Sequence, residues 1–546
     1  MTLKVNTPAG LRDVKDLKVK TAEGALADVE RLVVKTNDGT FEMVWGREPP
    51  EPPPPPPPPE PPEIPQGVEP LTLTVNTAID DPLDSEFILP IYSNPNWIVD
   101  WGDSVVARVR NLSEATHAYE TPGTYQIKIY PATAEAAQTA TATAWLLPFG
   151  FSLYDNYEKV PETGRNSMAH RQKVLHVAGT LVPEMFGTAS QIAEGKVGNS
   201  VCDHWFFGCT NLTMSDTFTF AGWENITEVG GAFCYSMFAR CSSDNFTMGT
   251  AFNLPQNIQI IGSSGARYAA INNNLRQKPS YGFCCEMFYG CNGSSFNMNS
   301  IFTLPQTLEM FGAWFCFAMF RDCSGNAFAM NQVFNLPQNV MHIQPANPSD
   351  MMGHVFEQTF YNCRGNAFTM NDIFQTPQNL EHGWVQTFSR MFYQCRGAAF
   401  KMNDIFTLPQ NMQKSYSGLA QYMFYRCDGA LFTMNQVFQA PPNIVHSYGH
   451  GRNHLRSTFN LCNGLAFQVN NVFEFPELSV SHLNTTVDSK GEINVGAYYQ
   501  TFAGITRPQN RTAASIIGTN PVPLAPREAF GTGFPDWSSI DANWRG

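Results

Sequence analysis

The stretch MFYGCNGSSFNMNSIFTLPQ, residues 287–306, carries a motif that returns down the chain. Variants of its first five letters are MFARC, MFRDC, TFYNC, MFYQC and MFYRC, each ending in cysteine. A cysteine that recurs in one setting is a metal ligand, half of a disulfide, a nucleophile or a core residue. The function of the chain depends on which of these roles the cysteine has.

The motif cysteines recur at a regular spacing. Eight of them mark the array: Cys209, Cys241, Cys291, Cys323, Cys363, Cys395, Cys427 and Cys462. Their separations are 32, 50, 32, 40, 32, 32 and 35 residues, which a unit of 32 with insertions of 18, 8 and 3 explains. Repeats of this length are typical of solenoids and propellers. We therefore expect a solenoid of about eight 32-residue units over residues 195–480.

Each unit can be numbered from its marker cysteine as position 0. Apolar residues at −7, −4, −3 and 0, such as Phe388, Met391, Phe392 and Cys395, follow the spacing of one helical face. Glycine at +2 suits a left-handed helix cap, and Phe at +5 with Met at +7 alternates like a short strand. Proline at +14 closes the segment in several units. The pattern predicts an α/β unit made of a helical turn, a cap, a strand and a turn.

Position −7 indicates the role of the cysteines. Four units carry a second cysteine there, and later units carry Phe356, Phe388, Ala420 and Leu455. Because this position accepts any apolar residue, we interpret the marker cysteine on the same stripe as a small buried hydrophobe. No unit has a CxxC pair or a histidine at a fixed distance from the marker, which argues against zinc. A disulfide, a metal site and a nucleophile are the alternatives.

Asparagine stands at +8 in six units. The six are Asn299, Asn331, Asn371, Asn403, Asn435 and Asn470. A stacked asparagine column typically bonds backbone groups of the neighbouring coil. We favour this role over ligand binding.

Other segments flank the array. Residues 1–46 contain the repeat DVKDLKVKTAEG and DVERLVVKTNDG, which predicts a small β module. Residues 47–70 predict a stiff polyproline II linker, with a docking site for a proline-binding domain as the alternative. Residues 71–148 alternate in short runs and predict an immunoglobulin-like β-sandwich. We expect residues 149–194 to form the connecting segment and the N-terminal cap of the solenoid, and residues 481–546 to form its C-terminal capping region.

Two motifs resemble known families. WIVDWGDS (97–104) and THAYETPGTYQIKI (116–129) resemble the PKD-type immunoglobulin-like domain, with Ser104 where the turn of that family ends in glycine. Asp100 and Asp103 are interpreted as turn-capping carboxylates rather than cation ligands. The MF-x-x-C signature resembles the BspA-like surface repeats, a branch of the leucine-rich-repeat class in which such arrays often follow a W-G-D-G domain.

Together, the PKD-like and BspA-like resemblances cover roughly residues 71–480. This chain has Phe and Met where the BspA-like family has Leu, and its unit is longer. The resemblance implies an α/β leucine-rich-repeat-like solenoid that serves adhesion and recognition rather than chemistry.

All three insertions fall after the Pro-Gln-Asn turn and before position −7, so they stack along one edge of a solenoid. That edge gathers aromatic, basic and histidine side chains, which suit stacking on sugars or packing on a protein epitope. The predicted receptor-binding residues are Arg267, Tyr268, Arg276, Tyr281, His382, Trp384, Tyr416, Tyr448 and Arg452. Solvated loops without a partner are the alternative. His446, His450 and His454 are spaced by four, but their glycine-containing segment indicates a loop, so no metal is predicted.

Composition excludes several function classes. A net charge of −13 without any Lys/Arg run argues against nucleic-acid binding. No segment is apolar enough to span a membrane, and the first residues lack the features of a signal peptide, so reduced cysteines are expected. No P-loop, G-x-S-x-G, HExxH or paired carboxylates appear. We predict a protein that is not an enzyme and has no cofactor.

These patterns predict a bacteriophage virion appendage, such as a tail fibre, made in the host cytoplasm. Residues 1–46 resemble the short attachment segments of phage fibre proteins, which implies binding to another virion structural protein. The linker projects the rest outward, and the array edge binds a host-surface glycan or protein. A bacterial cell-surface adhesin and a capsid decoration protein are the alternatives. No heptad repeat demands an oligomer, although phage fibres are commonly trimeric.

Overall fold

The structure, a computed structural model, divides the chain into two units, Met1–Glu60 and Pro61–Gly546. In the first unit it describes six short strands. In the second it describes residues 61–79, 85–91, 94–132, 146, 149–151, 170–261, 282–344, 353–415, 417–442, 444–446 and 454–467, and two strands nearer the C-terminus.

The first unit holds three antiparallel strand pairs. They are β1 (Lys4–Thr7) with β2 (Gly10–Asp13), β3 (Lys18–Lys20) with β4 (Leu26–Asp28), and β5 (Arg31–Lys35) with β6 (Phe41–Gly46). Because two-stranded hairpins are marginally stable in water, this unit depends on contacts among its hairpins or with a partner.

The second unit opens with two sheets. A six-stranded sheet has the order β10-β9-β12-β7-β13-β16, and a two-stranded sheet pairs β11 with β8. The bounds are β7 (Leu71–Asn76), β8 (Glu86–Ile88), β9 (Trp97–Asp100), β10 (Val106–Val109), β11 (Thr116–Ala118), β12 (Thr124–Pro131), β13 (Val174–Ala178) and β16 (Thr213–Met214). Leu71, Leu73 and Val75 are buried and alternate with half-buried polar residues, so one face of β7 lies on the core.

The W-G-D turn after β9 is held by its own carboxylates. Asp100 Oδ1 accepts the Gly102 N–H at 3.0 Å, and Asp103 Oδ1 accepts the Val105 N–H at 3.1 Å. These bonds confirm the prediction that both aspartates cap the turn. Ser104 adopts a φ of 76°, a left-handed conformation that favours glycine.

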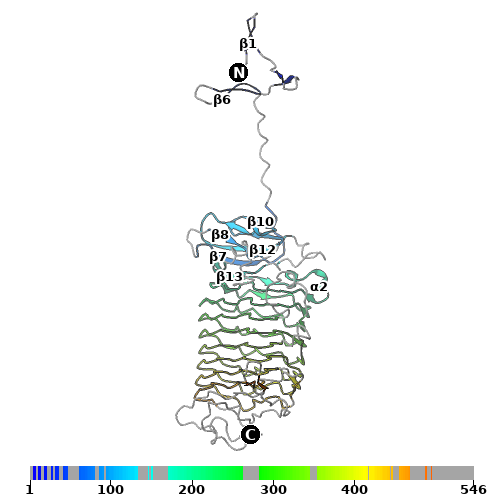
Figure 1. The fold of residues 1–546 in the computed structure, drawn as a ribbon, viewed down its shortest axis with the longest axis vertical. Coiled ribbons are helices and arrows are strands. Elements are labelled where there is room, and N and C mark those ends of the chain that lie inside the picture. Colours follow the sequence, from blue (N-terminus) through cyan, green and yellow to red (C-terminus); the bar gives the residue numbers. More distant parts are fainter. Residues whose placement is uncertain are drawn as a thin grey trace, which may run out of the picture. The chain divides into compact units, whose positions relative to one another are not determined.

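Strand β13 joins the two sheets to the coils that follow. It pairs antiparallel with β7 and parallel with β16, so a single sheet carries strands of both regions. The buried side chains of the sheets and of the coils form one continuous apolar cluster. Figure 1 shows β7 and β13 beside the first coils. The sheets therefore cover one apolar end of the stack, which a stacked array must shield from water.

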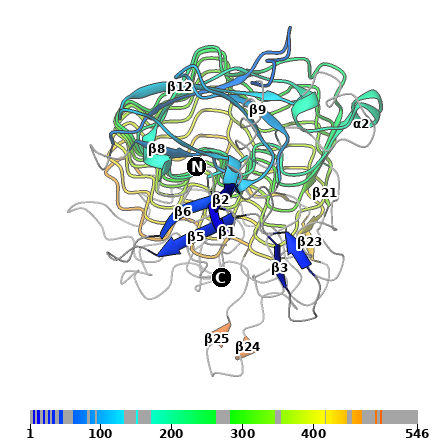
Figure 2. The ribbon, with the colours of Figure 1, turned by 90° about the horizontal axis from the view of Figure 1, so that it is seen from above.

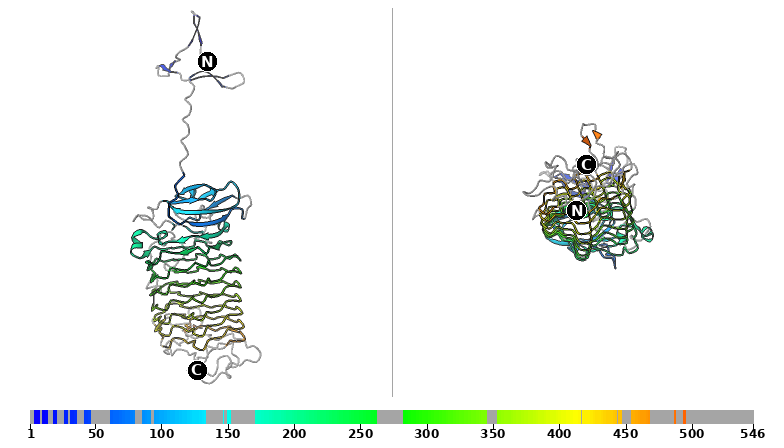
Figure 3. Two further views of the ribbon diagram at one scale, coloured as in Figure 1. Left: turned by 180° about the vertical axis from the view of Figure 1, so that it is seen from behind. Right: turned by 90° about the horizontal axis from the view of Figure 1, so that it is seen from below.

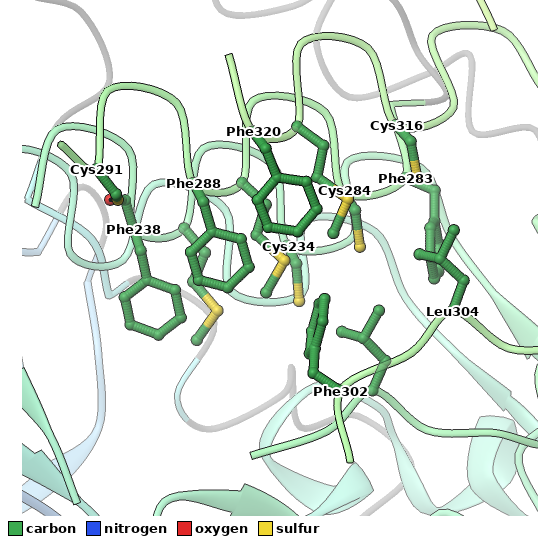
Figure 4. Packing of buried hydrophobic residues seen from close by; sticks show 14 of the residues in the cluster. Cys234, Phe238, Phe283, Cys284, Phe288, Cys291, Phe302, Leu304, Cys316 and Phe320 are labelled. Carbon is green, nitrogen blue, oxygen red and sulfur yellow. Dashed lines mark hydrogen bonds between the residues drawn. The ribbon is translucent and has the colours of Figure 1, made fainter. Parts of the chain in front are cut away.

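The repeats form a stack of similar coils, visible from two sides in Figures 1 and 3. Viewed along the stack, successive coils superpose (Figure 2). Phenylalanines at −3 form an interior column whose neighbouring rings are nearly parallel, with centroids 5.4–5.6 Å apart. Phe238, Phe288 and Phe320 of this column are drawn in Figure 4 beside cysteines of position −7. Each ring thus packs against its equivalents in the coils before and after it.

The segment from −9 to 0, here called the turn side, is not helical in the described units, although its apolar spacing predicts a helical face. In the unit of Cys323, positive φ recurs at Trp314, Cys316, Ala318 and Asp322, with values of 51–61°. A positive φ at the third residue is the mark of a type II turn, so the segment is a run of overlapping turns. Left-handed non-glycine residues each cost about 1–2 kcal/mol, so something else must stabilise the run.

Hydrogen bonds between coils provide that stabilisation. Alternate N–H groups of the turn side bond within the coil, as Arg321 N–H does to Ala318 O at 3.1 Å. Most of the groups between them bond to the next coil, as Phe320 N–H does to Thr359 O at 2.8 Å, and the N–H at −7 bonds to the preceding coil, as Cys316 N–H does to Phe283 O at 2.8 Å. In a helix the N–H groups would bond to carbonyl groups of the same segment. The carbonyl groups of the neighbouring coil would then have no donors. The turn side is therefore a structure that only stacking can sustain.

Glycine at +2 serves close packing rather than a left-handed cap. The six glycines of this column do not have positive φ, so the cap prediction is wrong. A Cβ atom added to Gly365 would lie 2.1 Å from the Gly325 carbonyl oxygen of the preceding coil. The corresponding distances at Gly293, Gly325, Gly397, Gly429 and Gly464 are 1.9–2.7 Å. Sequence alone does not separate the two uses of glycine, because both require the absence of a side chain.

All thirteen cysteines are buried as thiols, which confirms their interpretation as core residues. The marker thiol also bridges coils: Cys395 Sγ donates to the Phe360 carbonyl oxygen at 3.0 Å. The same bond from position 0 to the preceding −3 carbonyl recurs along the column at 2.9–3.2 Å. Burial raises the pKa of Cys323 and Cys427, so these donors stay protonated at neutral pH.

The asparagine column bonds the backbone, as predicted. Asn331 Nδ2 donates to the carbonyl oxygens of Asn299 and Phe302 in the preceding coil at 2.6 and 2.8 Å. Its Oδ1 accepts the N–H groups of Val333 and Phe334 in its own coil. Equivalent Nδ2 bonds to the preceding coil are present at Asn299, Asn371, Asn403 and Asn435, while Asn470 lies outside the described residues.

Short parallel strands recur between +18 and +21, here called the sheet side, rather than at +5 to +7; among the described residues β16, at +4 and +5 of the Cys209 unit, is the exception. These strands, with one earlier parallel pair, are β14 (Thr180–Leu181) with β17 (Thr219–Phe220), β15 (Lys196–Val197) with β18 (Glu228–Val229) and β19 (Ile260–Ile261), β20 (Met310–Gly312) with β21 (His342–Gln344), and β22 (Lys414–Ser415) with β23 (Val445–His446). His382 bridges β21 and β22. The sheet side therefore carries regular backbone pairing between coils.

The remaining elements are short. They are the 3-10 helices η1 (Leu112–Glu114), η2 (His170–Lys173) and η3 (Pro183–Met185), the helix α2 (Ala189–Ala193), and the antiparallel strands β24 (Thr486–Val487) and β25 (Ile493–Asn494). Thr188 and Gln191 form a capping box at the start of α2. Among the residues that the structure describes, no helix has the length and apolar character that a membrane crossing requires.

Candidate functional site

Position −2 of the turn side carries a line of aromatic and basic side chains. It lies between the buried Phe at −3 and the buried Cys at 0, and its residues are half-buried in most units. We define the tyrosine–arginine column as Phe207, Arg240, Tyr289, Arg321, Tyr361, Tyr393 and Tyr425, in which Arg240 reaches in from position −1. Each successive coil contributes one member.

The tyrosines of the column stack on one another. The rings of Tyr361 and Tyr393 have centroids 4.6 Å apart and planes 4° apart, and Tyr393 and Tyr425 follow at 4.7 Å and 11°. Partial burial between the neighbouring rings raises the pKa of Tyr393, so its hydroxyl remains a proton donor at neutral pH. Since stacking covers the ring faces, the column presents ring edges and hydroxyls to solvent.

The arginines lie between aromatic rings. Arg321 Cζ is 5.5 Å from the Tyr289 ring centroid and 4.7 Å from that of Tyr361. Arg240 Cζ is 5.4 Å from the Phe207 centroid and 5.9 Å from that of Tyr289. These cation–π contacts hold guanidinium groups at fixed places on the surface.

A groove of about 540 Å³ borders the N-terminal half of the column. Arg171, Arg240, Tyr289, Asp322 and Asn362 are among its lining residues. Asn362 Nδ2 donates to Asp322 Oδ1 at 2.5 Å, so two coils are tied together at the rim. The groove offers guanidinium, amide and hydroxyl donors in one concave surface.

Polar pairs continue beside the C-terminal half of the column. Arg396 Nε lies 3.1 Å from Asp428 Oδ1, and Arg364 hydrogen-bonds to Gln394. Each pair joins neighbouring coils, so the polar border has the same spacing as the rings. The chemistry suits repeated hydrogen bonds to hydroxyl, carboxylate or phosphate groups rather than a covalent step.

The sheet side places His382 at the surface predicted to bind the receptor. His382 is half-buried and lies next to His342, with ring centroids 5.0 Å apart. Partial burial lowers the pKa of His382, and the neighbouring His342 and Lys414 lower it further, whereas Glu381 opposes them. The imidazole is therefore held in its neutral form near pH 7.

Trp384 is bound into its surroundings. Its Nε1 donates to the Ile343 carbonyl oxygen at 2.7 Å, and its ring packs on the apolar core. The side chain is half-buried. Of the predicted receptor-binding residues, the following lie outside the described residues: Arg267, Arg276, Tyr268, Tyr281, Tyr416, Tyr448 and Arg452.

Sequence reasoning missed the tyrosine–arginine column. Its signal is the third letter of MFYGC, MFRDC, TFYNC, MFYQC and MFYRC, which is a tyrosine or an arginine in each. If the motif were a helix, there would be no reason to expect the side chains at −2 of successive units to contact one another. The stack supplies the reason, because equivalent positions of successive coils lie next to one another.

No protein-family model, curated protein or solved structure matches this chain.

Proposed function

We propose that this protein is a non-enzymatic appendage of a bacteriophage virion, such as a tail fibre, that binds a host-surface glycan through the tyrosine–arginine column. The observation that carries the proposal is the unbroken line of stacked tyrosines and sandwiched guanidiniums along a regular stack, with a groove beside it. A line of side chains that repeats coil by coil suits a polymer whose groups also repeat.

The donors of the column fit glycans that carry acidic groups. Arginine offers a planar fork of N–H donors to carboxylate and phosphate, and tyrosine adds a hydroxyl that both donates and accepts. Because the chain has a net charge of −13, long-range attraction does not favour an acidic polymer. Binding would therefore depend on short-range contacts rather than on long-range attraction.

The first unit and the proline-rich segment support the virion part of the proposal. Met1–Glu60 is a unit of three hairpins that is marginal by itself, and a partner surface would complete it. Polyproline II gains about 3.1 Å per residue, so residues 47–70 would carry the stack tens of ångströms from its anchor. Deleting residues 1–46 should abolish attachment to particles while the protein still binds host envelopes.

The test measures binding of the full-length protein to host-envelope glycans. A triple variant, Arg240→Ala, Arg321→Ala and Tyr393→Ala, should weaken binding about 30-fold or more, since aromatic and arginine anchors dominate recognition. The matched control changes exposed residues elsewhere on the coils, Gln332→Ala and Lys401→Ala, and should bind normally.

A second variant tests the sheet side. It changes Arg267, Tyr268, Trp384, Tyr448 and Arg452 to Ala. Loss of binding here, with the triple variant unaffected and melting unchanged, would move the receptor site from the column to the insertion edge. No binding by the native protein to any host-envelope fraction would contradict the recognition role itself.

A further inference from the structure

Three metal-ligating side chains meet on the sheet side. They are His342, Glu381 and His382, whose ligand atoms all lie within 4.8 Å of one another. We infer that this cluster binds a divalent transition metal of the zinc class and thereby ties two neighbouring coils together. The inference is independent of the proposed receptor site, which lies on the turn side.

The stack itself brings the ligands together. His342 and His382 are partners in a parallel β-bridge, so their side chains leave the same face one strand spacing apart. The Glu381 N–H donates to the Met341 carbonyl oxygen at 3.0 Å, which fixes the Glu381 backbone against the coil that carries His342. The two histidines are 40 residues apart in sequence, so no local sequence motif predicts the cluster.

The donor set fits zinc better than the hard cations. Two imidazole nitrogens and one carboxylate oxygen are borderline ligands, whereas calcium and magnesium take oxygen. Bonds to zinc of about 2.0–2.2 Å require ligand atoms somewhat closer to one another than they now lie, so the side chains must rotate inward. His342 is exposed, and none of the three side chains makes a hydrogen bond within the described part of the chain, so this rotation breaks none.

Lys414 opposes the metal. It is the next residue in the same column, as the bridge partner of His382 in the following coil. An ammonium group this close repels a divalent cation, and the Glu381 carboxylate offsets that repulsion. We therefore expect that removing the Lys414 ammonium group tightens metal binding, whereas removing a histidine weakens it.

The test titrates Zn²⁺ into the full-length, chelator-treated protein by calorimetry and follows Co²⁺ by its visible absorption. One ion per chain is expected, with an absorption band typical of nitrogen and oxygen ligands. His342→Ala and His382→Ala should each weaken binding by about 10-fold or more, since loss of even an outer-shell partner costs about that much. Lys414→Gln should bind more tightly than the native protein.

Glu309→Gln is the matched control, because Glu309 holds the same position in its unit as Glu381 and leaves the cluster intact. The chain has 11 histidines, so adventitious binding must be separated from binding at the cluster. Binding that survives both histidine variants, or no binding at all, would overturn the inference. His342→Ala changes an exposed side chain, so its result stands even if His382→Ala impairs folding.

Discussion

The turn side and the sheet side belong to the same coils, yet they hold neighbouring coils together in different ways. On the sheet side, short parallel strands pair with ordinary extended backbone. On the turn side, positive φ recurs at −9, −7, −5 and −1 in the units of Cys209, Cys241, Cys323, Cys363 and Cys395, and alternate N–H groups bond to a neighbouring coil. The first arrangement tolerates local change, and the second needs every residue in register.

This difference accounts for the place of the insertions. The 18-, 8- and 3-residue insertions all follow the sheet-side strands, and none falls between −9 and 0. An extra residue after a strand leaves the pairs before it intact. An extra residue on the turn side would exchange the two alternating sets of N–H groups and turn buried side chains outward.

The largest expected effect therefore comes from moving an insertion. One glycine inserted between Arg390 and Met391 should unfold the surrounding coils, at a cost above about 5 kcal/mol, because several inter-coil bonds and buried side chains are lost together. Three residues inserted after Gln344, where the chain already carries extra length, should cost less than about 1 kcal/mol. Thermal melting and limited proteolysis measure both. Equal losses would remove the distinction between the two sides.

A smaller effect tests the glycine column that follows the turn side. Gly365→Ala should destabilise the protein by about 3–5 kcal/mol, because the new Cβ would lie 2.1 Å from the Gly325 carbonyl oxygen and force two backbones apart. Asn366→Ala, the exposed neighbouring position, should change stability by less than about 0.5 kcal/mol. Chemical denaturation of the two variants provides the comparison. If Gly365→Ala lowered stability by less than about 1 kcal/mol, the stack would be able to widen locally.

Sequence predicts the parts of this fold that depend on repetition. The period of 32, the buried cysteines and the backbone role of the +8 asparagines follow from comparing units with one another. The spacing −7, −4, −3 and 0 is where the prediction fails, since overlapping turns bury the same four positions as a helix does. Hydrophobic periodicity predicts which residues are buried, but it does not predict the sign of the backbone angle φ.

The candidate site divides in the same way. The tyrosines at −2 are visible in the motif letters, but their stacking requires knowledge that the units lie in register. The sequence places His382 and Trp384 at the insertion edge, whereas the Trp384 bond to Ile343 O depends on a contact between two coils. Contacts between coils join residues that are far apart in sequence, so they cannot be predicted from the sequence of a single unit.

The smallest effect separates two cysteines of the turn side. Cys395→Ala should cost about 1 kcal/mol more than Cys316→Ala, because both remove a buried sulfur but only the thiol of Cys395 bonds a carbonyl of the preceding coil among the described contacts. Burial raises the pKa of both thiols, and unfolded thiols ionise only near pH 8.5, so the difference should stay constant from pH 6 to about pH 8. Above that pH the unfolded thiol loses its proton first, so native stability should fall as pH rises, with a shallower slope in either variant. Urea denaturation at several pH values measures these quantities. Equal losses at neutral pH would show that the marker thiol is only a small hydrophobe, and that backbone bonds alone hold the turn side together.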